Sequence, residues 1–129
     1  MLPRINPTNT SSWKALQQHA ASMKSVHMRE LFAEDPKRFE KFSLRFEDLL
    51  FDYSKNIVTE ETLHLLLALA EECRLPDAIK AMFNGFAINE TENRAVLHTA
   101  LRNYSGEAVF SQGKDVMPDV RKVLKKIKQ

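Results

Sequence analysis

Along most of this chain, apolar residues recur every three or four positions, the spacing that places them on one face of an α-helix. The runs begin at residues that suit the first turn of a helix. Thr59 offers a hydroxyl cap, and Glu60 and Glu61 place carboxylates at the positive end of the helix dipole. Pro76 and Pro118 supply the backbone angle that a first turn favours. The pattern therefore predicts a mainly α-helical fold.

The expected helices are read from these runs and their caps. They cover about 10–24 (capped by Asn9 or Thr10), 28–33, 36–39, 60–74, 76–84, a segment carrying Ala95, Val96, Leu97, Ala100 and Leu101 after the capping cluster 89–92, and 118–127. Their inward residues are expected to be Trp13, Leu16, Ala20 and Met23; Leu63, Leu66, Leu67 and Ala70; Ile79, Met82 and Phe83; and Val120, Val123, Leu124 and Ile127. Gly85 is expected to end the helix opened by Pro76.

One stretch follows a different period. Phe42, Leu44 and Phe46 alternate with polar residues, which predicts a half-buried strand, and 49–51 predicts a second strand after the turn at 47–48. We expect a loop between Gly106 and Gly113. The fold class is therefore mainly α with a short β-hairpin, or α+β.

Composition limits the class of protein. A chain of 129 residues that is 43% apolar and 28% charged is typical of a globular protein with one modest core. Cys73 is the single cysteine, which excludes an intrachain disulfide and favours a reducing compartment. No signal peptide is recognisable, and the longest apolar run, 65–70, is far shorter than the roughly 20 residues of a membrane span. We expect a cytoplasmic protein without a membrane partner.

The histidines do not form a recognisable metal motif. His19, His27, His64 and His98 lack paired spacing, and no cysteine cluster accompanies them, so no metal site is predicted. His98 and Arg94 are four positions apart on an expected helix and could point into one polar site. We interpret His98 as a hydrogen-bonded interior residue and Arg94 as the partner of a carboxylate.

Other candidate sites also have structural interpretations. Gly113-Lys114-Asp115 lacks the Ser or Thr of a phosphate-binding P-loop, and a carboxylate would repel phosphate. Cys73 follows two glutamates and is interpreted as a packing residue. Glu47, Asp48 and Asp52 could form a carboxylate pair, but Asp52 is expected to order the exit from a strand.

Positive charge is concentrated at the C-terminal end. Residues 114–129 hold six Lys or Arg against two Asp, whereas 1–113 carry a small negative excess. The lysines Lys122, Lys125, Lys126 and Lys128 could contact nucleic-acid phosphates. No aromatic residues alternate with them for base stacking, so we interpret them as a solvated helix face and expect no nucleic-acid partner.

Several motifs resemble the N-terminal part of the glucose-6-phosphate isomerase family. They are Ile5-Asn6-Pro7-Thr8 with Trp13 and Leu16, Asp52-Tyr53-Ser54-Lys55-Asn56, Thr59-Glu60-Glu61-Thr62-Leu63, the run 84–103, and Gly113-Lys114-Asp115-Val116-Met117-Pro118-Asp119-Val120. The segments 85–89 and 102–113 depart from the family pattern, which leaves functional contacts of those loops in doubt.

The resemblance implies that residues 1–129 are an N-terminal segment that stops before two sugar-phosphate-binding α/β subdomains of the SIS (sugar isomerase) type. Family members are cytoplasmic homodimers of glycolysis and gluconeogenesis that interconvert glucose 6-phosphate and fructose 6-phosphate without a cofactor, through a cis-enediol. The phosphate-binding runs and the catalytic glutamate, histidine and lysine of the family lie downstream of this segment. No catalytic or substrate-binding residue is therefore carried over to this chain, and we expect it to be an inactive scaffold by itself.

Two other functions remain open from the sequence. A non-catalytic helical protein-interaction module would use the same scaffold alone and would expose a large apolar face to a defined partner. A basic nucleic-acid binder would bind through the terminal lysines with steep salt dependence.

Overall fold

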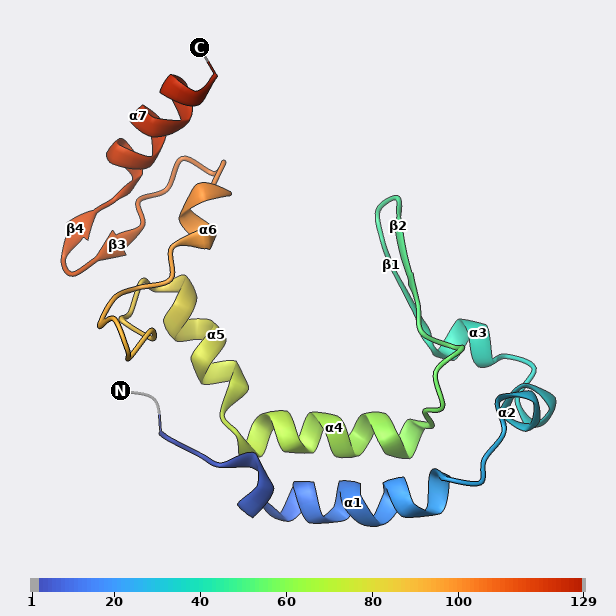
Figure 1. Cartoon of the computed structure of the whole chain (residues 1–129). Coiled ribbons are helices and arrows are strands. Elements are labelled where there is room, and N and C mark those ends of the chain that lie inside the picture. The colour runs from blue at the N-terminus through green and yellow to red at the C-terminus, as the bar shows by residue number, and fades with distance from the viewer. Residues whose placement is uncertain (1–2, 129) are drawn as a thin grey trace. The chain divides into compact units, whose positions relative to one another are not determined.

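The computed structural model describes residues 3–128, which form two compact units, Ile5–Cys73 and Arg74 onward together with residues 3–4 (Figure 1). The first unit contains η1 (Pro7–Asn9), α1 (Ser11–Met23), α2 (Met28–Glu34), α3 (Arg38–Lys41), β1 (Ser43–Phe46), β2 (Leu49–Asp52) and α4 (Glu60–Glu72). The second contains α5 (Leu75–Phe83), α6 (His98–Leu101), β3 (Phe110–Ser111), β4 (Lys114–Asp115) and α7 (Met117–Ile127). The predicted mainly helical α+β class is confirmed.

Helices α1 and α4 lie side by side in the first unit (Figure 1). Each begins at a predicted cap, since Thr10 Oγ1 accepts the Trp13 N–H at 3.1 Å and Thr59 Oγ1 accepts the Thr62 N–H at 3.3 Å. Polar contacts join the pair near both ends. His19 Nε2 lies 2.7 Å from Thr62 Oγ1, and the Glu72 carboxylate accepts the N–H groups of Ser11 and Ser12 at 3.0 and 2.9 Å. The end of α4 thus caps the start of α1.

These contacts correct the predicted inward face of α4. Thr62 and Glu72 share a helix face with Leu65 and Leu69, and this is the side turned to α1. The centre of the predicted stripe lies roughly a third of a turn from this side. Within that stripe Leu66 is exposed and Leu67 exposes 68% of its surface, whereas Leu63 and Ala70 are half-buried. Six apolar residues in succession at 65–70 made several faces look equally suitable.

The Glu72 cap predicts an acid-sensitive joint. Hydrogen bonds from Ser12 and Ser11 lower the pKa of Glu72 from 4.5 to about 2. A carboxyl whose pKa is depressed by folding contributes stability above pH 4.5 and loses that contribution as the pH falls toward 2. As the pH falls, we therefore expect the wild type to lose the stability that ionised Glu72 contributes. The Glu72→Gln variant has no such contribution to lose. Circular dichroism from pH 6 to 2 follows the acid unfolding of both proteins. Glu71→Gln is the control, because Glu71 is exposed on the same helix. Identical acid profiles for Glu72→Gln and the wild type would contradict the role assigned to Glu72.

Strands β1 and β2 form the predicted antiparallel hairpin, with Leu44 opposite Phe51 and Phe46 opposite Leu49. These four side chains share one face of the hairpin, because side chains alternate along a strand and directly opposed residues point the same way. The prediction that this face is half-buried is wrong for the described chain, since the four expose between 62% and 71% of their surface. The periodicity identified an apolar face, and no described element covers it.

Just before this hairpin, the helix expected at Pro36 begins later. Asp35 Oδ1 accepts the Lys37 N–H at 3.1 Å and holds 35–37 in a turn, so α3 starts at Arg38. The competing side-chain hydrogen bond explains the shift.

In the second unit, α5 has Pro76 in its first turn and ends before Gly85, as predicted. Gly85 has a φ of +68°, and a Cβ built on it would lie 2.0 Å from the Phe110 carbonyl oxygen. Only glycine fits such a close approach of α5 to β3 without displacing the backbone.

The long helix expected after 89–92 is wrong. Asn89 and Arg94 pair through both backbone N–H groups at 3.2 Å, which closes a turn, and helix forms only over His98–Leu101. The Asn89 side chain accepts from the Thr91 hydroxyl at 2.8 Å and from the Glu92 N–H at 3.4 Å. The residues predicted to cap a helix therefore satisfy a loop instead.

The segment expected as a loop contains a second hairpin, β3–β4, with Phe110 opposite Asp115. Its turn residues Gln112 and Gly113 both have positive φ, at 51° and 77°. Two successive residues with positive φ are typical of a tight type I′ hairpin turn. Helix α7 follows and begins near Pro118 as predicted, with Met117 buried beside α6. Val120 and Leu124 are half-buried, whereas Val123 and Ile127 are exposed, contrary to the prediction.

Candidate functional site

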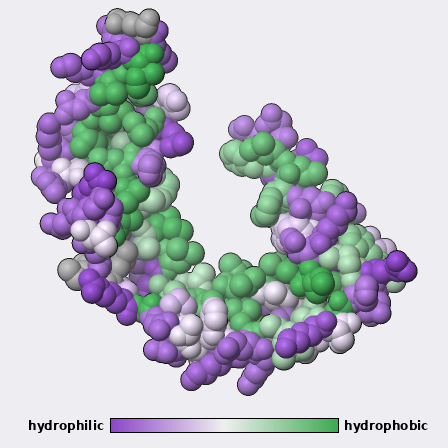
Figure 2. Space-filling model, viewed as in Figure 1, coloured by the Kyte–Doolittle hydropathy of each residue, from purple (hydrophilic) through white to green (hydrophobic). Residues whose placement is uncertain are grey.

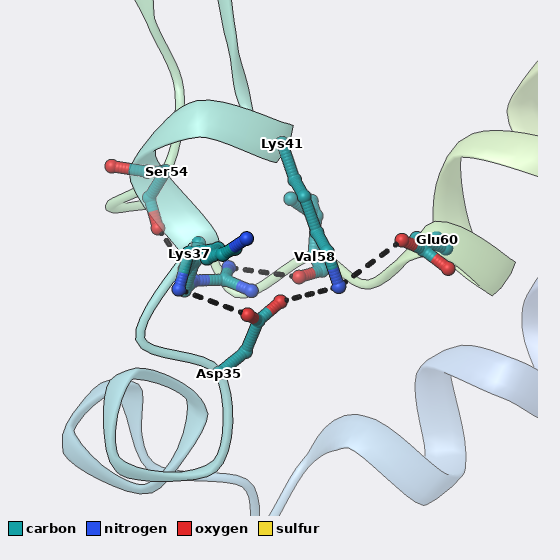
Figure 3. Close-up of polar contacts among 7 residues, drawn as sticks. Asp35, Lys37, Lys41, Ser54, Val58 and Glu60 are labelled. Carbon is teal, nitrogen blue, oxygen red and sulfur yellow. Dashed lines mark hydrogen bonds and ion pairs between the residues drawn. The ribbon is translucent and has the colours of Figure 1, made fainter.

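The most deeply buried charged side chain of the described chain is that of Arg38, which exposes 2% of its surface. Helix α3 directs it toward the segment that leaves β2. Its Nε donates to the carbonyl of Ser54 at 2.8 Å, and its Nη2 donates to that of Val58 at 2.8 Å (Figure 3). The same Nη2 also donates to the carbonyl of Asn56 at 2.7 Å. One guanidinium thus holds three carbonyls of one loop.

Aromatic rings and an ion-pair group surround this cluster. The Arg38 guanidinium lies 4.5 Å from the centre of the Phe42 ring, a distance suited to a cation–π contact. Nearby, Lys41 Nζ lies 2.8 Å from Asp35 and 3.5 Å from Glu60 (Figure 3). The hydrogen bond between Asp35 and Lys41 lowers the pKa of Asp35 and raises that of Lys41, so both stay charged over the physiological range.

Arg38 and the three carbonyls that it binds, which we call the Arg38 cluster, hold the backbone in place and form no catalytic arrangement. Its donors are directed at carbonyl oxygens of the chain, and the neighbouring cation is paired with carboxylates. We interpret it as the anchor of the 53–58 loop. Sequence reasoning missed Arg38, because arginine is usually exposed and its sequence neighbours gave no sign of a buried position.

The structure brings Arg94 and His98 to one pocket of about 540 Å³, formed by 89–101, the β3–β4 turn and α7. The two are not on one helix, because Arg94 closes the 89–94 turn and His98 begins α6. The predicted ion pair of Arg94 is confirmed, with Glu92 as partner. The interior position predicted for His98 is wrong, since its side chain is exposed. Because Arg94 is already ion-paired with Glu92 and His98 lies at the surface, the two side chains do not form an acid–base pair.

The other histidines are not grouped at one site. His19 contacts Thr62 as described above, and His27 and His64 are exposed. Within 3–128, no group of three or more His, Cys, Asp or Glu side chains is arranged to hold a metal ion. Cys73 is a half-buried free thiol at the end of α4.

The carboxylates of the hairpin act locally. Asp52 Oδ1 accepts the Ser54 N–H at 2.9 Å, and its hydrogen bonding to Ser54 lowers the pKa of Asp52. The prediction that Asp52 orders the exit from a strand is confirmed. In the second unit, Lys114 pairs with Asp119 at 2.8 Å and Asp115 accepts the Met117 N–H at 3.0 Å. Both groups of the phosphate-loop-like sequence are therefore engaged by their own unit.

A second pocket, of about 500 Å³, is mostly apolar and is lined by residues including Phe86 and Ile88. At its rim, Arg4 pairs with Glu90 at 2.6 Å. The pairing neutralises both charges and joins Arg4 to the second unit. No convergent set of nucleophile, base and anion-binding groups accompanies it among the described residues.

Comparison with known families gives one clear relationship. The family model described as phosphoglucose isomerase matches residues 52–129, well over half of the chain. The match starts in β2 and includes the Asp52–Asn56 motif, α4 and all the helices and strands of the second unit, α5 to α7. None of the described helices is both long enough and apolar enough to cross a membrane.

Proposed function

The chain belongs to the phosphoglucose isomerase family, and we propose that it supplies the N-terminal helical scaffold of such an enzyme. The reaction of the assembled enzyme is the interconversion of glucose 6-phosphate and fructose 6-phosphate, by proton transfer through a cis-enediol and without a cofactor. The catalytic carboxylate and the phosphate-binding groups belong to SIS-type α/β subdomains, which residues 1–129 precede. We further propose that the assembled enzyme is a cytoplasmic homodimer acting in glycolysis and gluconeogenesis.

The observation that carries this proposal is the large amount of apolar surface left uncovered. The buried apolar residues among those described are Leu31, Phe42, Ala100 and Met117. In contrast, hydrophobic surface lies open on the β1–β2 hairpin and along α4 (Figure 2). Exposed apolar patches beyond a few hundred Å² mark interaction surfaces, and covering them stabilises by roughly 25 cal/mol per Å². A scaffold that packs against further subdomains explains this distribution.

We expect the chain alone to have no isomerase activity, because no assembled acid–base and phosphate-binding site is found among its described residues. The test is a coupled assay on purified chain, with product formation followed by a dehydrogenase. Turnover that survives removal of host isomerase, and that a substitution in this chain abolishes, would contradict the proposal.

A second experiment tests the scaffold role directly. A phosphoglucose isomerase from which the counterpart of this chain has been deleted is produced in an isomerase-deficient host, with and without the chain. We expect co-production to restore isomerase activity and copurification. If the chain never restores activity, while the intact isomerase does in the same host, the scaffold role is wrong.

The alternative function is a non-catalytic helical protein-interaction module, favoured by the same exposed faces. The two functions differ in what happens to the chain alone. A module should be a monodisperse monomer that melts cooperatively, whereas an uncovered scaffold should be marginally stable or self-associating. Light scattering and thermal melting distinguish them.

A further inference from the structure

One edge of α7 carries apolar and cationic side chains in two parallel rows. Val123 and Ile127 lie one helical turn apart and expose 53% and 74% of their surface. Lys122 and Lys126 precede them by one position each and are also exposed. We call these four residues the α7 edge. Hydrophobic and hydrophilic surface accordingly lie next to each other on α7 (Figure 2).

The second unit leaves the cations of this edge without an ion pair. Its nearby carboxylates are engaged at the start of α7, where Asp119 pairs with Lys114 and Asp115 accepts the Met117 N–H. The pKa of Asp119 is lowered first by its hydrogen bond and charge interaction with Lys114 and least by the charge of Lys122. Among residues 3–128, no carboxylate forms an ion pair with Lys122 or Lys126.

A surface that covers the apolar row must also meet the cationic row. Residues one position apart on a helix are close enough that covering Val123 and Ile127 removes water from the stems of Lys122 and Lys126. A lysine ammonium that loses its water without gaining a partner destabilises the contact. A carboxylate on the facing surface replaces that water with an ion pair. Complementary charge also fixes the register of docking.

We propose that the α7 edge docks on a protein surface whose apolar patch is bordered by carboxylates, supplied by the remaining part of the isomerase. This inference rests on the scaffold role proposed above and adds the chemistry of the partner surface. Anionic lipid and nucleic acid would also attract the lysines. They offer no shaped apolar patch for the exposed ends of Val123 and Ile127, so we favour a protein surface.

The test uses the co-production assay with charge reversals. We expect Lys122→Glu with Lys126→Glu to lower the restored activity at least tenfold relative to the wild-type chain. The matched control is Arg121→Glu with Lys125→Glu, an exposed pair with the same four-residue spacing that changes the charge equally and lies on the side of α7 opposite the apolar row. It removes one exposed hydrogen bond, from Arg121 Nη2 to the Gly106 carbonyl. The control should retain restored activity within about twofold. Circular dichroism of the copurified or isolated chains checks that both variants keep their helices, and Lys122→Gln with Lys126→Gln provides a milder version of the change.

Each outcome decides the inference. Equal restoration by the two reversed pairs and the wild type shows that no carboxylates face the α7 edge, and the inference is wrong although the scaffold role stands. Failure of the wild-type chain to restore activity removes the scaffold role and the inference with it. Binding of the wild type to phosphatidylserine vesicles or to double-stranded DNA, abolished in the Lys122/Lys126 variant while restored activity is unchanged, also overturns it.

Discussion

Replacing Gly85 by Ala is expected to destabilise the second unit by about 2–4 kcal/mol, a large effect for a single substitution. Two costs add at this position. A φ of +68° is a left-handed backbone conformation, and a residue with a side chain in that conformation lowers the free energy of unfolding by roughly 1–2 kcal/mol. The new Cβ would also lie 2.0 Å from the Phe110 carbonyl oxygen, so α5 or β3 must move.

Gly106→Ala separates these two costs. Gly106 also has a positive φ, +84°, but no atom lies within 4 Å of a Cβ built there. It therefore reports the backbone cost alone. Urea unfolding followed by circular dichroism, with amide hydrogen exchange of α6 and α7 as a local measure, compares the two variants. Equal destabilisation by Gly85→Ala and Gly106→Ala would show that the contact with β3 relaxes freely.

Gly85 also illustrates what the sequence could predict. Its place after an apolar helical run predicted the end of α5 correctly, because helix termination depends on local backbone preference. The close approach to Phe110 was not predictable, since it joins residues distant in sequence. Local signals also gave correct predictions elsewhere in the chain. Local caps at Thr10 and Thr59 predicted the starts of α1 and α4.

The errors arise where local signals compete. Asn89 and the residues after it satisfy a helix start and a loop equally well in sequence, and the loop prevailed through side-chain hydrogen bonds. The β3–β4 hairpin has strands of only two residues, too short for an alternating pattern to be recognised. Its signal was the Gln112-Gly113 pair, which the structure places in a turn with two positive φ angles.

The candidate sites show a similar limit. The structure brings Arg94 and His98 to one pocket as their spacing indicated, yet by a turn and not by a shared helix. The position of His98 at the surface depends on the short α6, which the incorrect helix prediction concealed. The family relationship was predictable because motifs such as Asp52–Asn56 are recognisable in one sequence, and the family match over 52–129 confirms it.

Removing the Arg38 side chain is expected to have an effect of similar size in the first unit. Arg38→Met keeps much of the apolar stem but deletes all three hydrogen bonds to the carbonyls of Ser54, Asn56 and Val58. The carbonyls of Ser54 and Val58 are then left without a donor, which costs about 1–3 kcal/mol for each where water does not reach it, whereas the Asn56 carbonyl keeps the Val58 N–H. We expect a total loss of about 3–5 kcal/mol.

Arg38→Lys tests the geometry of the anchor. An ammonium carries the same charge but cannot present the planar fork that reaches three carbonyls, so most of the loss should remain. Lys37→Met is the matched control, since Lys37 is an exposed cation at the adjacent position. The measurement is urea unfolding with hydrogen exchange at Asn56 and Val58, whose N–H groups donate to Tyr53 and Asn56 within the anchored loop. A wild-type exchange rate in Arg38→Met would mean that the loop keeps its shape without the guanidinium, and the β1–β2 hairpin would then owe its placement to the contacts of Phe42 with Tyr53 instead.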